Sequence, residues 1–451
     1  MNVMQKLLIT VLIFLFYINS ALAYDMILPK EKKNYVTSNY AFFVGHARNG
    51  ESISINGEHI TTASNGAFAH SVKLKNGENR IAVKSDYSTR IYKFYKTSPN
   101  EVVKPELVEF EPRLYKISED NTPMRNTPVD YGMNRLSHLF KDTLLVIDGE
   151  KNGFYRVYLS KNKTGWVAKD SVTEVEEEVD VPKFITMNSE TFKNASSHTI
   201  EFSDKLPYTI DETDKEIIFK IYNPQYAENS VYTVNIRKPK KYTYKTVSSN
   251  GVYVFKVNKL PVPDEDNLEG LNIVVDAGHG GSENGAIGCL GDKEKDINLG
   301  IAQELKDILT QMGATVTMTR ECDGTISLAD RVKIAKENCA DIFVSVHLNS
   351  IPDIPMDIHK NRGTSVYYYN PNSKELAQSV EETLTDSINT RKDGVRTASF
   401  AVIRPTDYVG ILVETAYMTN PYDSVLYRSD SFARDTARGI ADGILNYVRG
   451  K

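Results

Sequence analysis

The sequence has 451 residues and a formal net charge of -5. At roughly 100 to 200 residues per domain, this length predicts about three or four domains. The charge balance offers no basic surface for nucleic acid, so we exclude nucleic acid as a partner. Three cysteines without a C-x-x-C pair argue against thiolate metal sites and disulfide scaffolds, although Cys322 and Cys339 could either pair or remain free thiols.

Residues 1–23 carry the features of a secretory signal peptide. Lys6 precedes an almost wholly apolar run from Leu7 to Ile18, and Ala21-Leu22-Ala23 has the form of a cleavage site. The apolar run is shorter than the ~20 residues that a membrane-spanning helix needs. We therefore expect an exported protein of the periplasm, the cell wall or the medium, without a permanent membrane anchor.

Residues 34–97 are predicted to form a small β-sandwich. Apolar and polar residues alternate in short runs, for example at 52–55 and 80–83. Asn-Gly pairs, a strong hairpin signal, interrupt these runs four times. The segment loosely resembles the immunoglobulin-like modules of secreted bacterial enzymes.

Residues 110–175 form a second β-rich segment. The order of its features resembles the bacterial SH3-like domain, above all in Gly165-Trp166-Val167-Ala168. Trp166 is the only tryptophan, and an exposed aromatic ring could stack on a sugar. A single tryptophan in a small barrel is more often part of the core, so we predict that Trp166 is buried.

Residues 183–260 form a third β-rich segment, with strand-like runs at 216–221 and 230–234. It follows a linker of Glu, Asp and Val residues, and a linker containing Pro261 and Pro263 comes after it. No motif assigns it to a family. We expect these β-rich units to position the protein on its substrate.

The pattern changes in residues 270–451, where apolar strands alternate with amphipathic helices. This order predicts an α/β fold with a mostly parallel sheet and right-handed crossovers, preceded by several small all-β domains. Ligands of such sheets gather at the carboxyl ends of the strands.

Four side chains are expected near those strand ends: His279, Glu294, His347 and Glu414. Two histidines and one carboxylate are a known catalytic zinc set that leaves one position open. The second carboxylate could then act as a general base. Spacing alone leaves open which glutamate binds metal and which moves a proton.

Several motifs follow one another in the order known for one enzyme family. They are 273–281, Gly285-Ala286, Gly291, Glu294-Lys295, Asn298-Leu299, Thr319-Arg320 with Asp323, Leu328 with Arg331, 345–349, Gly363-Thr364 and 412–414. On these motifs, residues 271–449 resemble the zinc-dependent N-acetylmuramoyl-L-alanine amidases of the Amidase-3 type. The resemblance implies His279, Glu294 and His347 as zinc ligands and Glu414 as the catalytic carboxylate. It implies a hydrolase that cuts the lactyl amide between N-acetylmuramic acid and L-alanine in peptidoglycan.

Arg404 and Asn349 are candidate substrate-binding residues on the same resemblance. The segment between His347 and Gly363 is short, which leaves little room for the inhibitory helix of regulated family members and predicts an open site. Two alternative functions are a zinc peptidase that cuts within the peptide stem and a non-catalytic peptidoglycan-binding protein.

Overall fold

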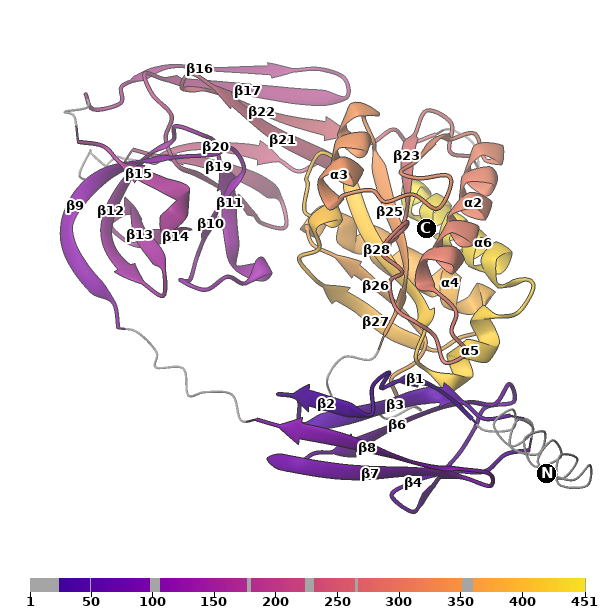
Figure 1. The fold of residues 1–451 in the computed structure, drawn as a ribbon. Helices are drawn as coiled ribbons and strands as arrows, with labels where there is room; N and C mark the ends of the chain where they lie inside the picture. The colour runs from indigo at the N-terminus through magenta and orange to yellow at the C-terminus, as the bar shows by residue number, and fades with distance from the viewer. Residues whose placement is uncertain are drawn as a thin grey trace, which may run out of the picture.

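A computed structural model describes residues 24–48, 50–97, 106–176, 180–223, 231–263, 267–350 and 360–450. The predicted signal peptide lies outside these residues, as does most of the short segment before Gly363. Three β units precede a C-terminal α/β domain (Figure 1). Within the described ranges, no helix is long and apolar enough to cross a membrane.

The first β unit (residues 24–97) consists of two sheets around one apolar core. Its sheets have the strand orders β1-β3-β6 and β2-β8-β7-β4-β5. The strands are β1 (Asp25–Leu28), β2 (Lys33–Val36), β3 (Tyr40–His46), β4 (Ile53–Ile55), β5 (Glu58–Ile60), β6 (Ala67–Lys73), β7 (Gly77–Ser85) and β8 (Thr89–Lys96). Asn56 and Gly57 both have positive φ, 51° and 86°, which gives the tight turn between β4 and β5 that an Asn-Gly pair favours. The first sheet begins at Asp25, ahead of the range expected from the alternating pattern.

The second β unit (residues 106–176) is one strongly bent sheet of seven strands, in the order β11-β10-β14-β13-β12-β9-β15. The strands are β9 (Val108–Ile117), β10 (Thr122–Arg125), β11 (Arg135–Leu139), β12 (Leu144–Lys151), β13 (Phe154–Ser160), β14 (Lys163–Ala168) and β15 (Val172–Glu174), with short 3-10 helices at η1 (Gly132–Asn134) and η2 (Lys169–Ser171). Trp166 is only 8% exposed. The prediction that this tryptophan belongs to the core is therefore confirmed.

The third β unit (residues 180–263) has a four-stranded sheet, β16-β17-β22-β21, and a three-stranded sheet, β18-β19-β20. The strands are β16 (Phe184–Thr191), β17 (Ala195–Phe202), β18 (Tyr208–Glu212), β19 (Glu216–Tyr222), β20 (Val231–Arg237), β21 (Tyr242–Ser249) and β22 (Val252–Lys259). One cluster of buried apolar side chains runs through both this unit and the second β unit. The two units therefore pack as one body.

The C-terminal domain (residues 267–450) contains a six-stranded sheet in the order β24-β23-β25-β28-β26-β27. The strands are β23 (Asn272–Ala277), β24 (Thr315–Met318), β25 (Ile342–Asn349), β26 (Thr364–Tyr368), β27 (Lys392–Thr397) and β28 (Val409–Tyr417). β23 is parallel to β24 and β25, β25 is parallel to β28, and β26 is parallel to β27. β26 is antiparallel to β28, so the sheet is mixed, with four of its five strand pairings parallel and one antiparallel.

Helices cover both faces of this sheet (Figure 1). They are α2 (Glu294–Gln311), α3 (Leu328–Glu337), α4 (Lys374–Ser387), α5 (Pro421–Tyr427) and α6 (Phe432–Arg449), with 3-10 helices at η3 (Pro371–Ser373) and η4 (Ala401–Ile403). Successive strand residues face opposite sides. Ile273 and Val275 accordingly join the core under α2, α4 and α6, whereas Val274 joins the core under α3 and η4.

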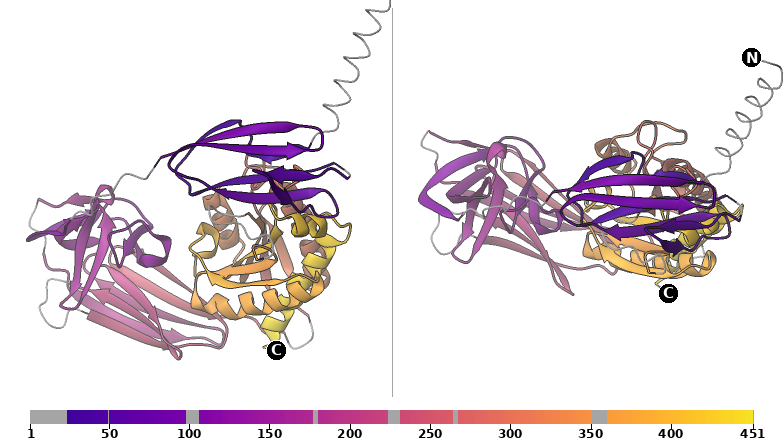
Figure 2. Two further views of the ribbon diagram at one scale, coloured as in Figure 1. Left: turned by 90° about the horizontal axis from the view of Figure 1, so that it is seen from below. Right: turned by 60° about the horizontal axis from the view of Figure 1, so that its bottom comes forward.

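The first β unit contacts the C-terminal domain near α5, and the other two β units lie on a different side of that domain (Figure 2). At the first contact, Cys289 and Leu290 pack against Val44, Ala67 and Ala69 of the first β unit. At the second, the amide of Tyr244 donates a hydrogen bond of 2.8 Å to the carbonyl of Thr406. Each of the three β units has its own sheet or sheets. The families of these units stay predictions.

Candidate metal centre

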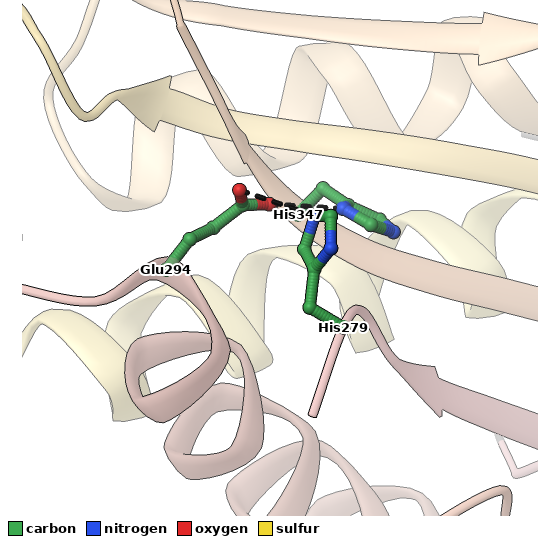
Figure 3. Close-up of side chains that lie close together, drawn as sticks. All are labelled: His279, Glu294 and His347. Carbon is green, nitrogen blue, oxygen red and sulfur yellow. Dashed lines mark hydrogen bonds and ion pairs between the residues drawn. The ribbon is translucent and has the colours of Figure 1, made fainter. Parts of the chain in front are cut away.

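Three of the predicted residues converge at the carboxyl edge of the sheet (Figure 3). His279 follows β23, Glu294 is the first residue of α2, and His347 lies near the end of β25. One ligand atom from each of the three lies within 4.8 Å of the others. Nε2 of His279 is 3.2 Å from Oε2 of Glu294, and Nδ1 of His347 is 2.9 Å from Oε1. Two imidazoles and one carboxylate therefore surround a common point.

Glu294 is held in place on both oxygens. It is 3% exposed, and the backbone amides of Ala286 and Leu348 donate to its carboxylate at 2.7 and 3.2 Å. Burial opposes its ionisation, but the hydrogen bonds from both histidines outweigh burial and hold the pKa of Glu294 well below its usual range. Its place at a helix N-terminus also favours a negative charge. The carboxylate is therefore a fixed anion.

His347 responds to the same carboxylate. Its burial lowers the pKa, but the hydrogen bond and the charge of Glu294 outweigh that effect and raise the pKa of His347 above its ordinary value. A divalent cation would compete with this proton for the ring nitrogen. The electrostatic field at this point therefore favours a positively charged occupant.

His279 has a backbone conformation that is rare for its residue type. Its φ is 58°, in the left-handed region, and such a conformation costs on the order of 1–3 kcal/mol in a non-glycine residue. Arg331 offsets part of this cost, because its Nη2 donates a hydrogen bond of 2.7 Å to the carbonyl of His279. The left-handed turn sends the imidazole toward Glu294 immediately after the strand ends.

Two buried arginines support the loop that carries His279. Arg320 donates to the carbonyls of Ala277 and Gly278, each at 2.9 Å. Arg331 donates to the carboxylate of Asp276 and, at 2.8 Å, to the carbonyl of Ala277. Asp276 also accepts hydrogen bonds of 2.6 Å from the hydroxyls of Thr319 and Ser345. These residues belong to the sequence motifs, but the motifs alone do not indicate that the arginines support the loop.

Glu414 lies beside the three converging residues on the neighbouring strand. In the parallel pairing of β25 with β28, His347 is the register partner of Glu414. Oε2 of Glu414 is buried and has no hydrogen-bond partner among the described residues. Burial raises the pKa of Glu414 to about 7, and the neighbouring imidazole of His347 offsets this only in part. The side chain is thus a basic carboxylate, one of whose oxygens has no partner in the part of the chain that the structure describes.

At two glycines the backbone lies in close contact with the side chains of the site. A Cβ on Gly278 would lie 2.3 Å from Cε1 of His347, and a Cβ on Gly285 would lie 2.4 Å from Oε2 of Glu294. Real Cβ atoms do not come this close to other heavy atoms. Both glycines are therefore needed to let the side chains of His347 and Glu294 lie where they do.

The two predicted substrate-binding residues lie in different places. Asn349 ends β25, two residues after His347, and its carbonyl accepts a hydrogen bond of 2.7 Å from the amide of Met418. Arg404 follows η4 and precedes β28, and its Nη1 donates to the carbonyl of Ser399 at 2.8 Å. Because Glu414 is near the carboxyl end of β28, Arg404 lies toward the opposite edge of the sheet. The substrate-binding role of both residues stays a prediction.

Comparison with known proteins gives a family for this domain. The family model described as N-acetylmuramoyl-L-alanine amidase matches residues 273–446. The uncharacterized protein YqiI of Bacillus subtilis is 35% identical over 184 residues, which are 40% of this chain and 86% of YqiI. The chain belongs to the N-acetylmuramoyl-L-alanine amidase family through this domain.

Further relatives cover a similar share of this chain. The N-acetylmuramoyl-L-alanine amidase LytC of Bacillus subtilis is 36% identical over 40% of this chain, and the match covers 36% of LytC. The probable cell wall amidase LytH of Staphylococcus saprophyticus is 33% identical over 41% of this chain and 61% of its own length. A solved N-acetylmuramoyl-L-alanine amidase from Clostridium difficile 630 is 32% identical over 40% of this chain and 98% of its own, with a TM-score of 0.38. The chain thus spans less than two thirds of LytC and of LytH.

Proposed function

We propose that this protein is a zinc-dependent amidase that hydrolyses the lactyl amide between N-acetylmuramic acid and L-alanine in peptidoglycan. The observation that carries the proposal is the convergence of His279, Glu294 and His347 within 4.8 Å, with Glu414 on the adjacent strand. Family membership supports the same reaction.

The side chains at the site fit a zinc ion. Imidazole nitrogen and carboxylate oxygen are both common zinc donors, and three protein ligands are typical of catalytic rather than structural zinc sites. We assign His279, Glu294 and His347 as the ligands. A zinc ion bound there supplies Lewis acidity, which polarises an amide carbonyl and lowers the pKa of water.

The chain's own residues then have separate tasks. Glu414 accepts the proton of the attacking water on its unpartnered oxygen and delivers it to the departing amide nitrogen. Glu294 cannot readily take that part, because its oxygens are occupied by both histidines and two backbone amides. Arg320 and Arg331 keep the loop of His279 in place and so hold the site ready for substrate.

The location and the modules form part of the same proposal. The apolar run at the start of the sequence supports export, and peptidoglycan lies outside the cytoplasm. We propose residues 34–97 as an Ig-like β-sandwich, 110–175 as a bacterial SH3-like β-barrel and 183–260 as an accessory β domain. We propose residues 270–451 as the catalytic domain, which the β units hold on the wall.

The test is digestion of purified peptidoglycan by the full chain, by Glu414→Gln and by Glu283→Gln. Glu283 is an exposed glutamate in the loop between His279 and Glu294, so its variant controls for loss of a nearby negative charge. Mass analysis should find free stem peptides that begin with L-alanine for the unsubstituted chain and for Glu283→Gln but not for Glu414→Gln. Products cut within the stem would indicate a peptidase, and the absence of products would indicate a non-catalytic binder.

A further inference from the structure

A second candidate binding site lies far from the metal centre, in a cleft of about 510 Å³ between the β units and the C-terminal domain. Arg135 of β11 lines it from the second β unit, Tyr208 and Tyr244 line it from the third, and Tyr369 and Arg404 line it from the C-terminal domain. All three bodies thus contribute to one concave surface. Ligand sites are often found at such boundaries between domains.

Two arginines meet on the wall of this cleft. Nη1 of Arg135 donates to the hydroxyl of Ser399 at 2.6 Å, and Nη1 of Arg404 lies 3.4 Å from the same oxygen. Arg135 also donates to the carbonyl of Gly132 and hydrogen-bonds the side chain of Tyr369, and Arg404 also donates to the carbonyl of Ser399. Two guanidinium groups that share one neutral hydroxyl repel each other, and the hydroxyl supplies no compensating charge.

The protein supplies no carboxylate to this pair among the residues that the structure describes. Asp407 and Glu212 also line the cleft, but Asp407 is 3.0 Å from Nζ of Lys336 and Glu212 is 3.2 Å from Nζ of Lys238. Nε of Arg135 is buried and has no hydrogen-bond acceptor in the same described residues. Both arginines are half-buried, and a partly desolvated charge without a counter-charge is costly, so an anion from outside the chain would stabilise this arrangement.

Titrating groups around the cleft respond to the excess positive charge. Burial lowers the pKa of His138, a lining residue, to about 4, and Arg135, Arg404, Arg125 and Lys336 add to the effect. Burial and the charge of Arg135 also lower the pKa of Arg404, while Tyr369 opposes them. The cleft is therefore electropositive even with His138 neutral.

The cleft and the metal centre occupy opposite edges of the sheet. Arg404 and Asp407 precede β28, whose first residue is Val409, whereas Glu414 lies five residues further along that strand. At about 3.3 Å per residue, roughly 16 Å of strand separates Val409 from Glu414. A group bound between the two arginines therefore cannot be the amide that is cut.

We propose that this cleft binds a carboxylate of a peptidoglycan peptide stem, at a second site that anchors the protein on the wall. The inference rests on the proposed function, because it takes peptidoglycan as the ligand. A planar carboxylate matches the fork of guanidinium donors, and stem peptides carry such groups at neutral pH. The cleft has room for a short peptide segment in addition to the carboxylate.

The test measures binding without cleavage, by sedimentation of the full chain carrying Glu414→Gln with purified sacculi. Adding Arg135→Ala and Arg404→Ala should weaken binding on the order of tenfold or more. Arg113→Ala is the matched control, because Arg113 is an exposed arginine of the second β unit whose ion pair with Glu174 lies at the surface, and it should leave binding unchanged. Arg135→Lys keeps the charge but loses the fork, so it should also weaken binding while preserving the fold.

A second measurement needs no substitution in the cleft. Sacculi whose stem carboxylates have been converted to amides should bind the Glu414→Gln chain as weakly as intact sacculi bind the double arginine variant. Equal binding to intact and amidated sacculi would overturn the proposal. The proposal would also be overturned if removal of phosphate polymers from the sacculi abolished binding and amidation of the stem carboxylates did not. Because sedimentation reports binding and digestion reports cleavage, failure of this inference is distinct from failure of the proposed reaction.

Discussion

The close contact between Gly278 and His347 gives a direct test of the proposed metal centre. An alanine Cβ at position 278 would lie 2.3 Å from Cε1, 2.4 Å from Nε2 and 2.6 Å from Nδ1 of the His347 ring. Ordinary contacts begin near 3.4 Å, so the ring must move by about 1 Å. Gly278 is not among the glycines with positive φ, so alanine brings steric conflict without backbone strain.

A displacement of about 1 Å at a catalytic group costs on the order of 10²-fold in rate. We therefore expect Gly278→Ala to lower kcat/KM about 100-fold, which corresponds to roughly 2.7 kcal/mol of lost transition-state stabilisation. The assay is the initial rate of release of L-alanine stem peptides, together with the zinc content of the purified protein. Both quantities should fall, because the ring that moves is a proposed ligand.

Gly300→Ala is the matched control for this experiment. Gly300 lies within α2, and an added Cβ there would meet nothing within 4 Å. Alanine in a helix interior is more favourable than glycine by roughly 0.5–1 kcal/mol, so this variant should be slightly more stable and fully active. Full activity and full zinc content in Gly278→Ala would refute the position assigned to the His347 ring.

Three further predictions follow from the same contacts. Asp276→Asn leaves the buried guanidinium of Arg331 without its counter-charge, so it should lower the free energy of unfolding, measured by urea titration, by about 3–5 kcal/mol. A loss below about 1 kcal/mol would contradict the buried pairing. Zinc at 100 times its Kd should stabilise the unsubstituted protein by about 2.7 kcal/mol and Glu294→Gln by much less, as measured by thermal unfolding with and without chelator. Equal stabilisation of the two proteins would show that Glu294 is not a zinc ligand. A thiol reagent should modify the exposed Cys322 and Cys339 in the folded protein but reach Cys289 only after denaturation, because Cys289 is 0% exposed and burial raises its pKa to about 12. Modification of all three cysteines in the native state would show that the contact of Cys289 with the first β unit is open.

The convergence of the histidines and Glu294 could be predicted from the sequence because it depends on local order. His279 and His347 each follow a short apolar strand, and neighbouring parallel strands end at the same edge of a sheet. Glu294 begins the amphipathic helix that follows β23. The first turn of that helix therefore lies at the edge of the sheet where β23 ends. The cysteines were less determined: pairing of Cys322 with Cys339 was one of two options, and the structure has all three cysteines as free thiols.

Other features depend on contacts that no local pattern records. The antiparallel pairing of β26 with β28 could not be predicted, because apolar alternation does not distinguish a parallel from an antiparallel neighbour. The role of Arg331 was missed because its partners Asp276 and His279 are more than 50 residues earlier in the chain. The left-handed backbone of His279 follows from that distant hydrogen bond and from its glycine neighbours, and a histidine in a sequence carries no sign of it.

The packing between domains changes what a truncation can show. Removing residues 34–172 should weaken wall binding if the β units hold the protein on peptidoglycan. The same deletion removes Asn65, whose Nδ2 donates a hydrogen bond of 2.9 Å to the hydroxyl of Ser424, and uncovers the buried Cys289. Cys289 is five residues before Glu294, so the loop that leads to a proposed ligand would lose its apolar cover. We therefore expect the truncated protein to lose zinc affinity as well as wall binding, whereas Arg135→Ala should affect wall binding alone, since Arg135 contacts the C-terminal domain at Ser399 on the other edge of the sheet.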